Sequence, residues 1–561
     1  MRIACAQINP IVGDIAGNGR RIGAAVARAA DAGADLVLFP EFALTGFPLQ
    51  DLLFDRDLLV GVERELERIA VDVGDPVVIL GAPRLEGGQR VNAAVVLHAG
   101  RIRATYRQRR AAVGEPQDGA RYFCAGEDDG LLVIGTTRVL IEVGADFLAP
   151  LSPAEGSVDL ICWVSAEQYR RDRGGPREAL LGERARRSGA AVAFCNRVGG
   201  QDDLVFDGRS TVVDRRGVAL GRAPEFEEHL LLVDLPPRAI GERGGEDRPG
   251  SEPLWRLARP PVRERSPVAG DLHPPLGEEA AVWAALRLGL RDYVTKNGAP
   301  GVVLGLSGGI DSALCAALAV DALGSVAVTG IALPSRHSAP ESLAGARALA
   351  EALDIELLVI PIEGPVASLE AALAGPLGAD APPVTWENLQ ARARGTLLMG
   401  YSNARGALLL ATGNKSEAAV GYSTLYGDMA GGFAPLKDVD KTWVYRLARW
   451  HNATAGRELI PQETIDRPPT AELRPGQRDS DSLPPYDLLD ALLADHIEGG
   501  LCASELVAAG HDPELVRRVL PMVDRAEFKR RQGPIGPTIG ARCFGRDRPM
   551  PITAQHDLPS F

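Results

Sequence analysis

Short apolar runs alternate with helical patterns along roughly the first two fifths of the chain. The apolar runs predict strands at residues 3–8, 34–39, 76–80, 92–98, 139–143, 158–164, 190–195, 210–213 and 229–233. Apolar residues at helical spacing predict helices at 18–32 and 177–188. Alternating strands and helices are typical of layered α/β units. Hairpin-like pairs around Gly100 and around residues 214–217 favour a mixed sheet sandwich over a purely parallel sheet.

A second α/β unit begins after Gly277. The pattern predicts helices at 278–296, 312–323 and 338–353, and strands at 301–306, 326–333 and 356–361. This order of strands and helices predicts a doubly wound parallel sheet. Helical patterns dominate from Trp386 to the end.

Between the two units, residues 236–275 are rich in Pro, Gly, Arg and Glu and show little periodicity. We therefore expect domains at 1–238 and 276–561 with an inter-domain linker at 239–275. An ordered surface excursion explains the same composition, and the sequence leaves that alternative open.

Composition narrows the class of protein. The 561 residues are 45% hydrophobic and 24% charged, and they contain no apolar run long enough for a transmembrane helix. The net charge of −13 argues against broad binding to nucleic acid or anionic membranes, but it allows one local phosphate site. The seven cysteines are scattered without Cys-x-x-Cys pairs, so we expect a cytoplasmic chain with neither a disulfide framework nor a zinc site.

A candidate phosphate loop follows the strand predicted at 301–306. It reads Gly-Leu-Ser-Gly-Gly-Ile-Asp-Ser, with the residues Gly305, Leu306, Ser307, Gly308, Gly309, Ile310, Asp311 and Ser312. Glycines let backbone N–H groups close around an anion, and the helix start adds further donors. Asp311 can hold Mg²⁺ against phosphates. Since no Gly-Lys-Ser/Thr follows, this is not the lysine-bearing P-loop. It resembles the pyrophosphate-binding loop of N-type ATP pyrophosphatases; the structural alternative is a capped glycine turn.

More segments follow in order and carry a closer resemblance. They are Leu-Pro-Ser-Arg-His-Ser at 333–338, Glu-Asn-Leu-Gln-Ala-Arg-Ala-Arg-Gly at 387–395, Thr-Gly-Asn-Lys-Ser-Glu at 412–417, Tyr-Gly-Asp-Met-Ala-Gly-Gly at 426–432, Arg-Pro-Pro-Thr-Ala-Glu-Leu at 467–473 and Glu-Phe-Lys-Arg-Arg-Gln at 527–532. Taken singly, Asn414 is also a helix cap and Glu417 a solvated helix residue. As an ordered set, spanning about 275–555, the segments resemble the synthetase domain of NAD⁺ synthetases.

The resemblance implies a role for each matching residue. ATP would contact the 305–312 loop, Arg336, Thr412 and Arg467. Asp311 and Glu417 would hold Mg²⁺, and the deamido-NAD side would comprise Asn388, Glu417, Asp428 and Lys529, with Asp311, Glu417 and Lys529 counted as catalytic. Relatives usually carry Lys where Arg467 stands, which keeps the charge but replaces a point donor with a planar fork.

The implied reaction is an amidation. The carboxylate of deamido-NAD would attack the α-phosphorus of ATP, pyrophosphate would leave, and ammonia would then displace AMP to form NAD⁺. The resemblance also implies a homo-oligomer formed through the synthetase domain.

The first unit resembles the nitrilase superfamily. The resemblance rests on Gln-Ile-Asn-Pro at 7–10 and Leu-Phe-Pro-Glu-Phe-Ala-Leu-Thr-Gly at 38–46. Residues 196–208 narrow it to the glutaminase domain fused to glutamine-dependent NAD⁺ synthetases. It implies an αββα sandwich over about residues 1–235.

Amide hydrolysis in that family uses a Glu base, a Lys and a Cys nucleophile. Glu41 matches the base. Counting back from residues 121–123 puts Gln108, or a neighbouring Arg, at the Lys position, and the strand at 139–143 puts Gly144 at the Cys position. Gly144 cannot attack an amide, so we expect an inactive first domain and ammonia as the direct nitrogen source.

Other hypotheses remain open. Cys124 or Cys162 is a candidate displaced nucleophile, which would make the enzyme fully glutamine-dependent. The chain is alternatively a non-catalytic scaffold, or an amide-forming or thiolating enzyme of the same pyrophosphatase-loop class with another substrate.

Overall fold

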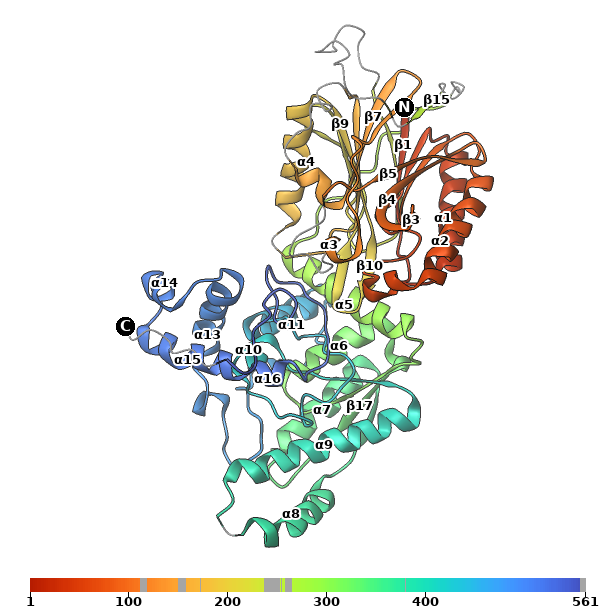
Figure 1. Ribbon diagram of the computed structural model, residues 1–561. Coiled ribbons are helices and arrows are strands. Elements are labelled where there is room, and N and C mark those ends of the chain that lie inside the picture. Colours follow the sequence, from red (N-terminus) through yellow and green to blue (C-terminus); the bar gives the residue numbers. More distant parts are fainter. Residues whose placement is uncertain are drawn as a thin grey trace. The chain divides into compact units, whose positions relative to one another are not determined.

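The computed structural model describes residues 1–110, 119–149, 158–171, 173–236, 253, 255–257, 265–378 and 380–554 (Figure 1). The chain forms two compact units. The first comprises Met1–Gln201 and Val205–Gly277, and the second comprises Asp202–Leu204 and Glu278–Phe561. Among the described residues, no helix is both long and apolar enough to cross a membrane.

The first unit contains two sheets. One has six strands in the order β14-β1-β2-β3-β4-β5. Their bounds are β14 His229–Asp234, β1 Arg2–Gln7, β2 Leu36–Leu38, β3 Val77–Glu86, β4 Gln89–His98 and β5 Arg101–Arg107. The neighbours β1, β2 and β3 are parallel, whereas β14, β4 and β5 pair antiparallel to theirs. The expected mixture of parallel and hairpin pairing is therefore present.

The other sheet has seven strands in the order β13-β12-β9-β8-β7-β6-β15. Their bounds are β13 Ala219–Arg222, β12 Thr211–Val213, β9 Ala191–Asn196, β8 Leu160–Ser165, β7 Thr137–Val143, β6 Leu131–Ile134 and β15 Trp255–Leu257. A separate hairpin pairs β10 Val198–Gln201 with β11 Leu204–Asp207.

Helices cover the outer faces of both sheets (Figure 1). Along β1, Ile3 and Cys5 point into the core between the sheets, whereas Ala4 and Ala6 point toward the core beneath α1 (Ile15–Asp31) and α2 (Arg56–Asp72). Helix α4 (Gly174–Ser188) packs against the outer face of the second sheet in the same way. Strands covered on both faces read as continuous apolar runs, as observed here. The expected αββα sandwich is confirmed.

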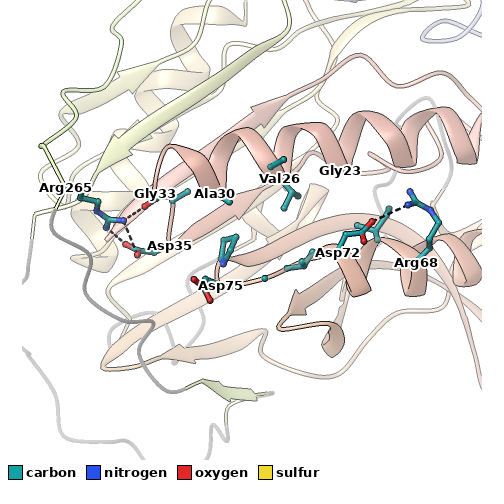
Figure 2. A pocket seen from close by; sticks show the side chains of 15 residues that line it. Gly23, Val26, Ala30, Gly33, Asp35, Arg68, Asp72, Asp75 and Arg265 are labelled. Atoms are coloured by element: carbon teal, nitrogen blue, oxygen red, sulfur yellow. Dashed lines mark hydrogen bonds and ion pairs between the residues drawn. The ribbon is translucent and has the colours of Figure 1, made fainter.

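Part of the predicted linker returns to the first unit. β15 pairs with β6, and Leu272 forms a bridge with Arg222 at the end of β13. Arg265 pairs with Asp35 at 3.2 Å on the rim of a cavity of about 390 Å³ beside α1 and α2 (Figure 2). These described parts match the ordered excursion that the sequence left open; residues 237–252, 254 and 258–264 lie outside the described residues.

The second unit is built on a parallel sheet of four strands in the order β18-β17-β16-β19. Their bounds are β16 Val302–Gly305, β17 Val328–Ala332, β18 Glu356–Val359 and β19 Leu408–Leu410. The chain moves from β16 to β17 and β18 on one side and returns to β19 on the other. Ligands of doubly wound proteins bind where the strand order reverses in this way, which here is the carboxyl end of β16 and β19.

Helices make up most of the remaining chain of this unit. Their bounds are α5 Glu278–Lys296, α6 Ile310–Leu323, α7 Pro340–Leu353, α8 Glu363–Leu377, α9 Pro383–Arg405, α10 Lys415–Val420, α11 Lys441–Ala455, α12 Gln462–Asp466, α13 Tyr486–Leu493, α14 Ala503–Ala508, α15 Pro513–Arg525 and α16 Glu527–Arg530. A second apolar core, which includes Leu489, Leu506 and Val516, joins α10, α13, α14 and α15. The doubly wound sheet and the helical second half agree with the sequence analysis.

Candidate functional site

The predicted loop lies in a cavity of about 300 Å³ at the strand-order reversal of the second unit. Residues 305–312 line it, together with Thr412 after β19, Glu417 on α10 and Arg467 after α12. These residues are far apart in the sequence, and the parallel sheet brings them to one edge. Most of the predicted ATP side is therefore one surface.

The loop is held in the conformation expected of an anion cradle. Gly308 has φ +78°, and a Cβ there would lie 2.3 Å from the Ser342 carbonyl oxygen, so only glycine fits. The Ser307 and Ser312 hydroxyls are 3.1 Å apart, and the Gly309 N–H donates to Ser307 Oγ at 3.2 Å. The loop leads directly into α6, whose first N–H groups have no partner in the helix.

Asp311 and Glu417 converge on one ammonium group. Lys441 Nζ donates to Asp311 Oδ2 and, at 3.1 Å, to Glu417 Oε1. Asn414 Nδ2 donates to Asp311 Oδ1 at 2.8 Å, and Asn414 and Glu417 form a capping box at the start of α10. Lys441 was not among the predicted site residues. Its signal in the sequence is weak: a lysine at the first position of a helix opposes the helix dipole.

The cluster carries one more negative charge than positive charge. Burial, together with Asp311, raises the pKa of Glu417 to about 7 against the opposing effect of Lys441. Two carboxylates with an excess negative charge, beside a loop of N–H and hydroxyl donors, are the donor set that Mg²⁺ uses when it also binds substrate phosphates. Asp311 and Glu417 therefore fit the metal that the sequence analysis assigned to them.

Besides Lys441, two arginines line the same cavity. Arg467 donates to Ser342 Oγ at 2.9 Å. Arg394, which sequence reasoning did not select, donates from Nε to the Leu333 carbonyl at 3.0 Å, and burial lowers its pKa. Arg394 lies in the segment that carried the resemblance at 387–395, which was the available signal. Both guanidinium groups can meet phosphate or carboxylate oxygens.

Of the residues assigned to the dinucleotide, Glu417 and Asp428 line the cavity, whereas Asn388 lines neither this cavity nor the one that contains Lys529. Desolvation raises the pKa of Asp428 to about 6, although the side chain lines the cavity, and Lys529 opposes that shift. Lys529 Nζ donates to the carbonyls of Gly421 and Ser423 at 2.7 and 2.6 Å. Asn388 accepts a hydrogen bond from Thr424 at 2.9 Å. Lys529 lines a smaller cavity of about 130 Å³ that also contacts Glu417 and Asp428.

Arg336 is the exception among the predicted ATP residues. Its guanidinium is exposed and pairs with Glu363 at 3.1 Å and with Glu370 at 3.0 Å. These carboxylates lie on α8, and they also raise the pKa of Arg336. Arg336 is absent from the cavity lining because these two ion pairs hold it outside.

The first unit brings together the residues matched to the glutaminase site. Glu41 follows β2, Gln108 follows β5 and Gly144 follows β7, so all three lie at carboxyl ends of strands. A Cβ at Gly144 would be 3.0 Å from Gln108 Nε2 and 3.0 Å from Glu41 Oε1. Asn92 Nδ2 donates to Glu41 Oε1 at 2.6 Å and to Gln108 Oε1 at 2.9 Å. The glycine thus adjoins the base, and a neutral amide lies beside both.

Two neighbouring arginines form ion pairs, and the two candidate thiols differ in burial. Arg107 pairs with Glu86 at 2.9 Å and Arg109 with Asp129 at 2.9 Å. Cys162 is fully buried between the sheets, and burial raises the pKa of its thiol well above the usual range. Cys124 is exposed. A buried thiol with a raised pKa is a poor nucleophile.

Two families match the chain in the same order as its two units. Residues 2–243 match the carbon-nitrogen hydrolase family and residues 282–533 match the NAD synthase family.

Similar proteins match along the full length. A glutamine-dependent NAD(+) synthetase of Xanthomonas campestris is 44% identical over 99% of this chain and 97% of its own. That of Thermotoga maritima is 41% identical over 100% and 99%. The structure of glutamine-dependent NAD+ synthetase from Acinetobacter baumannii, in complex with ADP, has a TM-score of 0.75 at 35% identity and covers 98% of both chains. The chain therefore belongs to the two-domain NAD synthetases, in which a carbon-nitrogen hydrolase domain precedes an NAD synthase domain.

Proposed function

We propose that this protein forms NAD⁺ by ATP-dependent amidation of deamido-NAD through an adenylated intermediate, with release of AMP and pyrophosphate. One observation carries the proposal: the 305–312 loop, Asp311 and Glu417 line a single cavity in the unit that matches NAD synthase. The corresponding domains are residues 1–238 and 276–561, joined by residues 239–275.

In this proposal the loop binds the phosphates of ATP. The N–H groups of Ser307 to Ile310 and the hydroxyls of Ser307 and Ser312 donate to the pyrophosphate as it departs, which stabilises the negative charge that develops there. Asp311 and Glu417 hold Mg²⁺, which supplies further charge neutralisation at the phosphates when it is bound. Thr412 and Arg467 complete the ATP side, and Arg336 joins them only after its ion pairs with Glu363 and Glu370 open.

Lys441 positions both carboxylates. Because its single ammonium contacts both, it keeps Asp311 and Glu417 aimed at the same point before the metal and ATP bind. No enzyme nucleophile is required: the substrate carboxylate attacks the α-phosphorus, and ammonia then attacks the acyl carbon and displaces AMP. Asn388, Asp428 and Lys529 hold the dinucleotide so that its carboxylate faces that phosphorus.

The similar proteins bear on the nitrogen donor. The relatives from Xanthomonas and Thermotoga are named glutamine-dependent synthetases, and each match spans both units of this chain. Their names favour glutamine as the donor here, which agrees better with the glutamine-dependent alternative than with our expectation of ammonia.

This chain's own residues support ammonia. Gly144 occupies the place beside Glu41 where a nucleophile would stand, and Gln108 provides no positive charge for an oxyanion. Cys162, the displaced candidate, is buried in the core. We therefore retain ammonia as the direct donor and glutamine dependence as the second candidate.

The test is one assay with two nitrogen donors. The purified chain receives ATP, Mg²⁺ and deamido-NAD with either ammonium or glutamine, and NAD⁺, AMP and glutamate are quantified. We expect NAD⁺ and AMP in equal amounts with ammonium, and no glutamate from glutamine. NAD⁺ formation driven by glutamine, lost in Cys124→Ser or Cys162→Ser, would establish the second candidate. Failure with both donors would remove the proposed function.

A further inference from the structure

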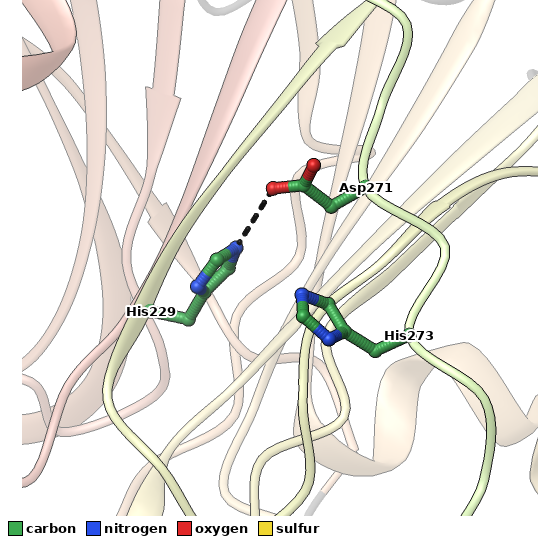
Figure 3. Close-up of side chains that lie close together, drawn as sticks. All are labelled: His229, Asp271 and His273. Carbon is green, nitrogen blue, oxygen red and sulfur yellow. Dashed lines mark ion pairs between the residues drawn. The ribbon is translucent and has the colours of Figure 1, made fainter.

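Two histidines and one aspartate meet on the surface of the first unit, and none of them is among the residues matched to the glutaminase. They are His229, the first residue of β14, and Asp271 and His273 in the segment that returns from the predicted linker. Figure 3 shows the two imidazole rings and the carboxylate around a common space. One ligand atom from each residue lies within 4.8 Å of those of the other two.

The backbone explains why these side chains meet. Leu272 bridges to Arg222, the Arg222 N–H donates to the Asp271 carbonyl at 2.6 Å, and the His273 N–H donates to the Arg222 carbonyl at 3.1 Å. The segment is therefore extended, and residues two apart in an extended segment point to the same side. Asp271 and His273 consequently face β14 together, where His229 stands.

The spacing of these three side chains fits a shared metal ion better than it fits direct hydrogen bonds between them. His229 Nε2 is buried and has no hydrogen-bond partner among the described residues, and Asp271 Oδ2 lies 3.5 Å from it. Two ligands of one tetrahedral zinc ion, with bonds of about 2.0–2.1 Å, are themselves about 3.4 Å apart. The His273 ring lies edge-to-face with that of His229, at 79° with centroids 5.4 Å apart, and both rings border the same space as the Asp271 carboxylate (Figure 3).

The local charge also suits a cation. Two neutral imidazoles and one carboxylate carry a net charge of −1. Arg222, the nearest cation on the bridged strand, is paired with Glu178. A neutral ring presents a lone pair, which metal coordination requires.

We propose that His229, Asp271 and His273 bind a divalent first-row transition-metal ion of the zinc class, with water at the remaining position. Imidazole and carboxylate are the ligands that such ions take, and three protein ligands leave one position open. Bound metal would tie residues 271–273 to β14 and so fasten the end of the returning segment to the first unit. The site is independent of the synthetase reaction.

The test uses the full-length, tag-free chain after removal of metal with a chelator. Zn²⁺ is titrated by calorimetry, and Co²⁺ is used as a spectroscopic probe of coordination by imidazole. We expect one saturable Zn²⁺ equivalent per chain, visible Co²⁺ absorption bands that Zn²⁺ displaces, and a higher melting temperature with Zn²⁺.

Matched variants locate the site. His273→Gln and Asp271→Asn should each weaken Zn²⁺ binding at least about 10-fold, and Zn²⁺ should no longer raise their melting temperatures. His98→Gln changes the remaining histidine of the first unit and should bind as the unchanged chain does. Glu417→Gln should also bind normally, because it alters the other carboxylate site.

Circular dichroism of each variant reports whether it folds, and Asp271→Asn is a change at an exposed position. Absence of saturable binding by the folded chain would overturn the proposal. So would binding that survives both His273→Gln and Asp271→Asn, or binding that is lost in Glu417→Gln.

Discussion

At the scale of single residues, Asp311 and Glu417 both contact the Lys441 ammonium. A variant that removes the charge of either carboxylate tests whether that residue binds Mg²⁺. We expect Asp311→Asn and Glu417→Gln each to lower the rate of amidation at least about 100-fold, since loss of one preorganised electrostatic contact costs about 10²–10³-fold in kcat. Steady-state rates with saturating ATP, deamido-NAD and ammonium measure this. Asp354→Asn is the matched control, because Asp354 is an exposed helix cap in the left-handed region that Asn also adopts. Near-normal turnover in either site variant contradicts the metal assignment.

The charge of Glu417 also makes stability depend on pH. Its pKa rises from 4.5 to about 7 on folding. Between these values the folded state holds a proton that the unfolded state has released, so the contribution of this group to the free energy of unfolding falls as the pH rises toward 7. Glu417→Gln removes this pH-dependent fall in the free energy of unfolding, because Gln does not ionise. The Gln side chain can still form the capping box.

Without ATP or Mg²⁺, the change in melting temperature caused by Glu417→Gln should therefore be more favourable at pH 8 than at pH 5, whatever the constant cost of losing the contact with Lys441. Differential scanning calorimetry at both pH values measures it. An equal change at the two pH values shows that the buried charge is compensated by another group.

A substitution at Gly144 tests whether the first unit can hydrolyse glutamine. A cysteine there would place its Cβ 3.0 Å from a Glu41 oxygen and from Gln108 Nε2, and it would have to adopt φ +50°. Gly144→Cys should release no glutamate from glutamine, because the side-chain atoms nearest to a Cβ at that position belong to Gln108 and Glu41, and neither residue brings positive charge to stabilise the oxyanion. The ammonium-dependent rate of the same variant is the internal control and should not change. Glutamine-driven NAD⁺ formation by this single variant would show that Gln108 suffices in place of Lys.

At the scale of elements, the β16–loop–α6 unit depends on close approach of two backbones. Gly308→Ala would have to adopt positive φ and would also press its Cβ against the Ser342 carbonyl. Gly406→Ala is the matched control, since Gly406 has φ +65° and a Cβ added there would meet no described atom within 4 Å. Positive φ alone costs an alanine roughly 1–2 kcal/mol.

We expect Gly308→Ala to lose more stability than Gly406→Ala and to raise the KM for ATP, whereas Gly406→Ala leaves that KM unchanged. Thermal unfolding and initial rates measure the two effects. Equal losses of stability in both variants would mean that α7 moves away freely, so that the close approach of the two backbones is not important for function.

At the scale of the whole molecule, we predict that α8 takes part in the homo-oligomer that the family resemblance implied. Val366 is its one buried residue among those described, while Leu369 and Leu377 are 40% and 43% exposed. We expect light scattering on a sizing column to give a multiple of 59.4 kDa. Leu369→Glu with Leu377→Glu should lower the mass, and Val326→Glu, at a fully exposed position elsewhere, should not. A mass of 59.4 kDa for the unchanged chain removes the prediction.

Two strands, β5 and β15, show where the sequence pattern is too weak to define an element. β5 was expected only as the second arm of the hairpin around Gly100 and received no bounds, because Arg101, Arg103, Thr105 and Arg107 alternate with less polar residues along it; it forms the edge of its sheet. β15 has only three residues, and its pairing with β6 makes it a strand. Neither has a continuous apolar run, which was the signal used for strands.

The sequence by itself determined what depends on neighbouring residues. The helix predicted at 278–296 has those bounds as α5, and the turn that places Gly308 before α6 follows from glycines and a helix start close together in the chain. Side-chain periodicity and turn geometry act over a few residues, so they can be read along the chain. The adjoining positions of Glu41, Gln108 and Gly144 were instead implied by the resemblance to the nitrilase superfamily.

Only the tertiary structure decided which distant residues meet. Lys441 contacts Asp311 across 130 positions, Arg336 is drawn away from the cavity by Glu363 and Glu370, and His229 meets His273 because a bridge to β13 folds the linker back. Each depends on the path of the chain between the partners. Ion pairs and ligand sets form wherever that path brings charges together, and no local periodicity encodes it.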